Sequence, residues 1–384
     1  MANDKDFIVK NAVEVGGPTN VTLGTITSST VDLSTGNYFS ETLAANTTYA
    51  FSNAGDVQSF QLEVTGADVT EYYDLANSTY LGYNYDVGSE AESALSDITF
   101  NGDGTKMYAI GTDGDKVLQY SLSTPYTLTS VSYDSVSFSV LSQDTFPSGV
   151  RFNNDGTKMY IVGYSTDAMY EYDLSTAYDI STASYNSVSF SISGQTSTCR
   201  GFDFKPDGTK VYAIEQTGST VYQYSLSTAW DLSTASYDSV SFSAASQDSD
   251  STGLGFSSDG TKMFIAGIIN DSVFQYSLST PWDVSTASYD NISKNIVAQV
   301  ANLLGLNIHP NGTYYYGYNG NTDQIFQYSM TSSATATITW PTSIEWAGGM
   351  SPAAPATGET DLFTFSTDDG GTSYIGLKTA DNLS

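Results

Sequence analysis

Apolar residues recur at every second position in short segments along most of this chain, and polar turns separate the segments. Ile98 and Phe100 lie two apart, and so do Phe202 and Phe204. Alternation of this kind places both side chains on one face of a β-strand. The same spacing is found in Val150 and Phe152, Leu254 and Phe256, and Leu306 and Ile308. The pattern predicts an all-β protein built from short strands.

One turn sequence repeats at a fixed interval of 52 residues. Asp-Gly-Thr-Lys begins at Asp103, Asp155, Asp207 and Asp259, and a degenerate copy, Asn-Gly-Thr-Tyr, begins at Asn311. Glycine accepts the positive φ that a tight hairpin turn needs. Each copy has room for four strands, and four antiparallel strands in about 50 residues are typical of a propeller blade.

The two ends of the repeat region predict how the ring closes. The fifth copy lacks an evident fourth strand, whereas residues 78–87 resemble an orphan fourth strand ahead of the first copy. Pairing the two would remove the exposed strand edges. We therefore expect a five-bladed β-propeller at residues 70–330. It is inserted into one small β-sandwich-like module made of residues 21–69 and 331–384, and residues 1–20 form an N-terminal arm.

The acidic charge balance disfavours nucleic acids and anionic membranes as partners of this chain. The 384 residues include 42 acidic and 12 basic side chains, a formal net charge of -30. No basic stripe is present to neutralise a nucleic acid backbone or an anionic membrane. No segment has the roughly 20 apolar residues of a membrane span. The first residues lack the apolar run of a signal peptide, so we expect synthesis and solubility in a cytoplasm.

Residues that could carry chemistry are few. Asp97 and Asp203 are the acidic residues on inner strands without a counterpart in the other blades, and a solvated channel-lining Asp203 is favoured over a catalytic acid. His309 is the one histidine, and we interpret it as a turn residue because one histidine cannot form a histidine-rich metal site. Cys199 is the one cysteine and is expected to be a buried, unreactive side chain. We expect no enzyme activity, metal or cofactor.

Two repeated features leave alternatives open. The Asp-Gly turns offer oxygen ligands for calcium, but they lack further fixed carboxylates, and plain hairpin turns are favoured. A column of aromatic residues recurs at the blade period and would either stack on sugars or pack under the long loops, with packing favoured. The column consists of Tyr126, Tyr178, Trp230 and Trp282.

Loop variation predicts where a ligand binds. The first-to-second and third-to-fourth loops, nearly invariant, form one face of the propeller, here named the turn face. The second-to-third and blade-to-blade loops differ between copies and form the opposite, variable face. Recognition commonly resides in loops on a rigid scaffold, although neutral drift explains the variation equally well. The candidate ligand-binding residues are Asp113, Asp115, Tyr164, Asp167, Arg200, Gln216, Asp248, Asp250, Asn270, Asp271 and Asn319.

Segments outside the repeats resemble a β-module of structural proteins in tailed bacteriophages, especially marine ones. The similar segments are residues 31–39, 47–53, 59–65, 338–349 and 365–374, and residues 5–11 are similar to the start of phage fibre and appendage proteins. In that family the two halves of the module usually follow each other directly, whereas here the propeller separates them. The resemblance describes a structural family and carries no catalytic residues.

The resemblance implies a virion structural protein, as a fibre, an appendage or a capsid decoration, made in the host cytoplasm. Its implied partners are other virion proteins and a host surface glycan or protein, with the chain itself in a homo-oligomer, a trimer being favoured. The alternatives are a secreted or cell-surface lectin-like propeller and, third, a propeller hydrolase acting on polysaccharide. Close similarity between the blades disfavours the hydrolase, because catalysis on a propeller needs special residues from different blades.

Overall fold

The computed structural model describes residues 22–88 and 94–383. Its regular elements are β-strands with short 3-10 helices between some of them, and no α-helix occurs among these residues. The chain divides into two compact units, one of residues 71–332 and one of the residues up to 70 with those from 333 onward. The all-β prediction is confirmed.

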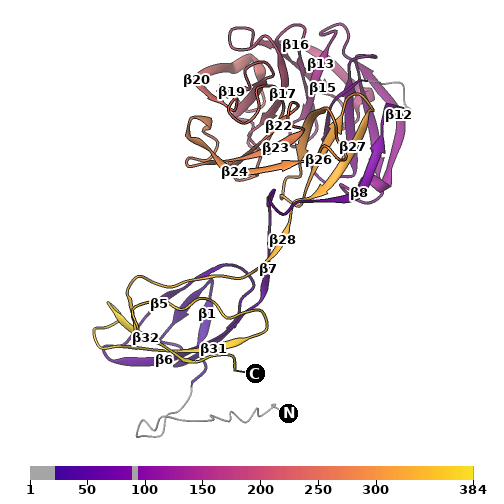
Figure 1. Cartoon of the computed structure of the whole chain (residues 1–384). Coiled ribbons are helices and arrows are strands. Elements are labelled where there is room, and N and C mark those ends of the chain that lie inside the picture. The colour runs from indigo at the N-terminus through magenta and orange to yellow at the C-terminus, as the bar shows by residue number, and fades with distance from the viewer. Residues whose placement is uncertain (1–21, 89–93, 384) are drawn as a thin grey trace. The chain divides into compact units, whose positions relative to one another are not determined.

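The larger unit is a series of four-stranded antiparallel sheets, one for each sequence repeat (Figure 1). In the first sheet, β9 (Leu95–Phe100), β10 (Lys106–Gly111), β11 (Lys116–Leu122) and β12 (Val131–Ser139) follow in spatial order. The second sheet contains β13 (Pro147–Phe152), β14 (Lys158–Gly163), β15 (Ala168–Leu174) and β16 (Ala183–Ser191). The third contains β17 (Cys199–Phe204), β18 (Lys210–Glu215), β19 (Thr220–Leu226) and β20 (Ala235–Ser243). The fourth contains β21 (Ser251–Phe256), β22 (Lys262–Gly267), β23 (Ser272–Leu278) and β24 (Ala287–Asn295).

The fifth sheet is completed by a strand from before the first repeat. It contains β25 (Leu303–Ile308), β26 (Tyr314–Asn319) and β27 (Gln324–Ser329), and β8 (Thr79–Asp86) takes the fourth place by pairing antiparallel with β27. Figure 1 shows violet β8 beside orange β27, although they are far apart in the sequence. The strand pairing predicted for residues 78–87 is confirmed.

Burial falls from the inner to the outer strands of each sheet. In the first sheet, Met107–Gly111 of β10 are buried, whereas every residue of β12 is at least partly exposed. The first strands of neighbouring sheets contact one another in the order β9, β13, β17, β21 and β25, and β25 also contacts β9. Because adjacent sheets cover both faces of the inner strands, those strands are buried almost throughout, while residues of the outer strands alternate between half-buried and exposed.

The repeated turns are held by their own side chains. Asp103 Oδ1 accepts hydrogen bonds from the Thr105 N–H at 3.0 Å and hydroxyl at 2.6 Å, and Gly104 has a φ of +71°. These hydrogen bonds lower the pKa of Asp103. The same bonds recur from Thr157 to Asp155, Thr209 to Asp207 and Thr261 to Asp259. The hairpin interpretation of the Asp-Gly sequences is confirmed.

The smaller unit joins the two ends of the chain in one sheet. Its five strands lie in the order β3 (Tyr38–Thr42), β6 (Gln58–Thr65), β31 (Thr360–Thr367), β32 (Tyr374–Ala380) and β30 (Ile344–Trp346). β6 pairs antiparallel with β31, so that Phe60 faces Phe365 with ring centroids 5.0 Å apart. Residues from before and after the repeats thus share a single core, in which Trp340 packs on Phe363.

Shorter strands complete this unit. A three-stranded sheet contains β1 (Thr25–Thr27), β2 (Thr30–Asp32) and β5 (Ala50–Ser52), and β4 (Thr47–Thr48) pairs with β29 (Ile338–Thr339). The chain passes between the units at β7 (Asp68–Glu71) and β28 (Ser332–Thr335), which pair with each other. The N-terminal arm predicted for residues 1–20 lies outside the described residues.

Candidate functional site

The inner strands of the larger unit carry one position at which all five repeats differ. Counted at intervals of 52 residues, this position holds Thr99, Arg151, Asp203, Gly255 and Asn307. The position two residues earlier is nearly uniform, with Asp97 in the first repeat and glycine in the other four. The five differing residues all line one cavity. The repeats therefore differ most where their first strands meet.

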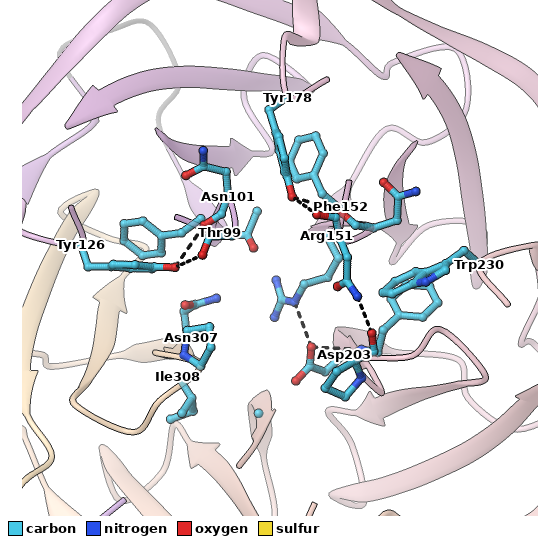
Figure 2. Close-up of a pocket in the computed structure, with 18 of the residues that line it drawn as sticks. Thr99, Asn101, Tyr126, Arg151, Phe152, Tyr178, Asp203, Trp230, Asn307 and Ile308 are labelled. Atoms are coloured by element: carbon cyan, nitrogen blue, oxygen red, sulfur yellow. Dashed lines mark hydrogen bonds and ion pairs between the residues drawn. The ribbon is translucent and has the colours of Figure 1, made fainter. Parts of the chain in front are cut away.

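The cavity has a volume of about 370 Å³ and opens on the turn face. Its wall includes Phe100, Phe152 and Phe204 from the ends of the first strands, and Tyr126, Tyr178 and Trp230 from the third-to-fourth loops. Figure 2 shows Arg151 and Asp203 pointing toward the middle of this cavity, with Asn307 on the opposite side. The cavity therefore combines charged and amide side chains from the first strands with a wall of aromatic rings.

Arg151 is held between two carboxylates. Its Nη1 lies 2.6 Å from Asp97 Oδ2, and its Nε lies 3.5 Å from Asp203 Oδ1. Asp97 is buried and also accepts hydrogen bonds from the Val150 N–H at 3.0 Å and the Tyr318 hydroxyl at 2.9 Å. Charge-assisted hydrogen bonds of this kind hold the guanidinium in one orientation.

The two carboxylates differ in access to the cavity. Asp97 is almost wholly buried, whereas the Asp203 side chain is 26% exposed and lines the cavity. Burial raises the pKa of Asp203 to about 6, against the attraction of Arg151, which lowers it. Asp203 is therefore the group whose charge changes within the cavity at mildly acidic pH.

The aromatic column has a defined packing role. Tyr126, Tyr178 and Trp230 have φ values of 57°, 61° and 64°, and each ring covers the glycine of its own turn. A Cβ added to Gly208 would lie 2.4 Å from the Trp230 ring. The favoured packing interpretation is confirmed, and the cavity lining shows that the same rings are also accessible to a ligand.

The fifth member of the column comes from outside the repeats. Tyr73, with a φ of 57°, covers Gly312 in the fifth turn just as Trp282 covers Gly260 in the fourth. Neither Tyr73 nor Trp282 lines the cavity. The aromatic wall is thus one-sided, which distinguishes Trp230 from the otherwise equivalent Trp282.

Tyrosines of the second strands fasten this wall to the neighbouring sheet. The Tyr160 hydroxyl donates to the Trp230 carbonyl at 2.6 Å, and the Tyr316 hydroxyl donates to the Tyr126 carbonyl at 2.7 Å. Tyr108 makes the same bond to Tyr178. These partly buried hydrogen bonds between sheets fix the positions of the rings that line the cavity.

Some predicted residues of the variable face form hydrogen bonds that link neighbouring sheets at that face. Asp271 Oδ1 accepts from the Leu303 N–H at 3.0 Å, at the start of the next sheet, whereas Asp167 Oδ1 has no hydrogen-bond partner among the described residues. Pro147 stands at the matching place after Asp115 and has no N–H to give. Among the described residues, Asp115 Oδ1 has no hydrogen-bond partner.

Other predicted residues are also bound within their loops. Asp248 is buried and accepts from the Asp250 N–H at 2.9 Å and the Asn270 N–H at 3.0 Å. Asn319 is buried and donates to the Ala301 carbonyl. Asp113 is exposed on its loop. The variable face remains a predicted ligand surface. The buried groups Asp248 and Asn319 stabilise its loops through these hydrogen bonds.

Three predicted residues of the variable face do come together. Arg200 Nε donates to Gln216 Oε1 at 2.7 Å, and the Arg200 guanidinium lies 4.7 Å from the centre of the Tyr164 ring. These side chains come from the second and third sheets. The cluster lies at the end of the first strands opposite to the cavity and shares no residue with its lining.

The remaining candidates have structural surroundings. His309 is buried, its Nδ1 accepts from the Asn311 N–H at 3.1 Å, and burial lowers its pKa to about 4, so the turn interpretation is confirmed. Cys199 is fully buried, and burial raises its pKa to about 12, which makes the thiol unreactive.

Sequence reasoning identified Asp203 and the aromatic column but not Arg151, Asn307 or Thr99. The signal that could have found them is the comparison of one inner-strand position across all five repeats. Overall similarity between the repeats concealed this single variable position.

The solved structures that match this chain do so at low sequence identity. No family model and no curated protein matches the chain. A structure named "putative 6-phosphogluconolactonase" from Bacteroides uniformis is 14% identical over 61% of this chain and 80% of its own, with a TM-score of 0.40. The β-propeller domain of Cps50 (Swd1) from Myceliophteria thermophila is 10% identical over 61% and 82%, with a TM-score of 0.38. In the described part of the chain, no helix is long and apolar enough to cross a membrane.

Proposed function

We propose that this chain is a binding protein whose five sheets are the blades of a closed propeller, and that the central cavity receives one or two sugar units of a surface glycan. The split module carries the propeller, and the setting we propose is the surface of a virion. The observation that carries the proposal is the cavity, in which five different inner-strand residues meet a one-sided aromatic wall.

Closure is supported by the strand contacts. The inner strands touch in cyclic order, with β25 against β9, and β8 supplies the missing strand of the fifth sheet. With β8 in place, β27 is not left as an exposed edge, and the fifth sheet has four strands like the others. The propeller axis then coincides with the place where the differing residues meet.

The chemistry of the cavity suits a carbohydrate. Its volume of about 370 Å³ lies in the lower part of the range of small-molecule sites, roughly 300–1,000 Å³. Aromatic faces pack on the C–H groups of a sugar ring, and buried polar groups select its hydroxyls. Asp203 supplies acceptors and Asn307 supplies a donor and an acceptor on opposite sides of the cavity.

The carboxylates favour binding over hydrolysis. Glycoside hydrolases of the common types use two carboxyl groups that flank the scissile bond. Asp203 is the one carboxylate among the residues that line the cavity, and the nearby Asp97 is buried behind Arg151. A propeller hydrolase would need a second accessible carboxylate, so we rank it below a binding protein.

The virion setting is a proposal from sequence resemblance. The resemblance is carried by residues 31–39, 47–53, 59–65, 338–349 and 365–374, which are similar to phage structural modules. β6 and β31 bring parts of these segments into one sheet, which supports treating them as a single module. The alternative, a secreted or cell-surface lectin-like propeller, would use the same cavity without a virion.

Two tryptophan variants of the full chain test the sugar-binding proposal. Trp230→Ala removes a ring that lines the cavity, while Trp282→Ala removes the equivalent ring from a turn outside it. Glycan-array screening followed by titration calorimetry with the best oligosaccharide compares the two. We expect Trp230→Ala to weaken binding about tenfold or more, the loss of about 1.4 kcal/mol, and Trp282→Ala to leave it nearly unchanged.

Three results would count against the proposal. Equal losses in both variants would mean that the rings act only through stability. If the protein bound no glycan on the array, carbohydrate would be rejected as the ligand of the cavity. Release of shorter sugars from the bound oligosaccharide, detected by mass spectrometry and lost in Asp203→Asn, would replace the binding protein by a hydrolase.

A further inference from the structure

Arg200 occupies an unusual place on the variable face. It lies on β17, where the other repeats carry Ser96, Ser148, Thr252 and Leu304 at the matching position. Its guanidinium carbon lies 4.9 Å from the centre of the Phe146 ring and 4.7 Å from the centre of the Tyr164 ring. The two rings are themselves 5.0 Å apart. The cation is therefore seated against two aromatic rings at once, which stabilises it by the attraction of the ring faces.

A hydrogen bond fixes one edge of the guanidinium. Arg200 Nε donates to Gln216 Oε1 at 2.7 Å. Among the described residues, no other hydrogen-bond partner and no ion-pair partner of Arg200 is present. The N–H donors of the two terminal nitrogens therefore have no protein acceptor among the described residues. Gln216, Phe146 and Tyr164 already set the orientation of the side chain.

An arginine without a carboxylate partner is unexpected in a chain with a formal net charge of -30. The other arginine, Arg151, has ion-pair contacts with both Asp97 and Asp203. Asp250 acts on Arg200 electrostatically, but the pair forms no ion-pair contact within the described part of the chain. Burial lowers the pKa of Arg200, and arginine nevertheless stays charged at neutral pH.

We propose that Arg200 is the centre of a second binding site, which takes a carboxylate or sulfate group of an acidic glycan. A forked pair of N–H donors matches two oxygens of one oxyanion, and the rings beside it offer an apolar surface to the attached sugar. This site goes beyond the central cavity, because Arg200 does not line that cavity. It uses Tyr164, Arg200 and Gln216 of the variable face.

Titration of the full chain with oligosaccharides of equal length tests this site. The probes are trigalacturonate, a sulfated trisaccharide and neutral maltotriose, followed by calorimetry or by NMR shifts. Arg200→Gln removes the charged fork, and Lys116→Gln removes one positive charge next to the loop Thr112–Asp115 of the same face as a matched control. We expect at least one acidic probe to bind, Arg200→Gln to weaken it about tenfold or more, and Lys116→Gln to change it less than about twofold.

The comparison of probes and variants separates the outcomes. Tighter binding of trigalacturonate identifies the carboxylate, and tighter binding of the sulfated sugar identifies the sulfate. Equal affinity in Arg200→Gln, equal losses in both variants, or no saturable binding of either acidic probe would overturn the proposal. Arg200→Lys keeps the charge without the fork, so it serves as the test if Arg200→Gln unfolds. Neutral sugar bound in the central cavity should be lost in Trp230→Ala and retained in Arg200→Gln, which keeps the two proposals distinguishable.

Discussion

Arg151 Nη1 lies 2.6 Å from the carboxylate of Asp97 in the neighbouring sheet, and Arg151 itself lines the cavity. Asp97 also accepts a hydrogen bond from Tyr318 of the fifth sheet. One carboxylate of the first sheet thereby contacts residues of the second and the fifth sheets. The other four repeats have glycine at this position, so the contact occurs once.

Asp97→Asn should destabilise the fold strongly. The amide cannot balance the charge of Arg151, and breaking one partner of a buried ion pair typically costs about 3–5 kcal/mol. Urea unfolding followed by tyrosine and tryptophan fluorescence measures the loss. Asp155→Asn is the control, because Asn311 already fills that place in the fifth turn. An unfolding free energy for Asp97→Asn close to that of the control would contradict a structural role for the pair.

Stability should depend on pH through Asp203. Its folded pKa, about 6, lies above its ordinary value of 3.8, so the folded state binds the proton more tightly than the unfolded state. The resulting stabilisation is present in full below pH 3.8 and is lost as the pH rises through about 6. The unfolding free energy of the natural chain, relative to Asp203→Asn, should therefore fall between pH 4 and pH 7. Parallel curves for the two proteins would show that Asp203 has no raised pKa.

Gly208→Ala should be costly. Gly208 has a φ of +72°, and a Cβ there would meet the Trp230 ring at 2.4 Å. A side chain at such a position adds backbone strain and displaces the ring, for a loss of about 1–3 kcal/mol and a weaker central site. Gly194→Ala provides the comparison, since no atom lies within 4 Å of its added Cβ. Thermal unfolding of both variants measures the difference, and equal melting temperatures would refute the expected clash.

Loss of a hydroxyl between sheets should loosen the aromatic wall. Tyr160→Phe removes the donor to the Trp230 carbonyl, at a cost of about 1 kcal/mol or more because the carbonyl is left without this donor. Phe264 is the natural counterpart without a hydroxyl, next to Tyr73 in the closing segment. The unfolding free energy, measured by fluorescence during urea unfolding, and the affinity for sugar should both decrease in Tyr160→Phe. Unchanged values for both would show that this hydrogen bond does not position Trp230.

Light scattering of the full chain after size-exclusion chromatography tests the predicted oligomer. The chain mass is 41.0 kDa, and the virion proposal leads us to expect a mass three times larger. A monomer across the accessible concentration range would favour the free lectin-like alternative over a virion component.

Much of the fold follows from local patterns in the sequence. Alternating apolar residues specify strands, Asp-Gly specifies turns, and the fixed interval places each strand within its repeat, so residues 78–87 could be matched to the vacant place beside β27. Each of these signals operates within a few residues or through simple repetition. These signals can therefore be recognised in the sequence without knowledge of the tertiary structure.

The central site needed the tertiary structure. Thr99, Arg151, Asp203, Gly255 and Asn307 are separated by whole repeats, and only packing of the first strands around one centre brings them together. Tyr73 likewise completes the aromatic column from outside the repeat frame. The sequence by itself determined the strands, the turns and the segment that pairs with β27, because these depend on local geometry and periodicity. Which side chains share a cavity was decided by the tertiary structure, since burial, charge pairing and access arise from contacts between distant segments.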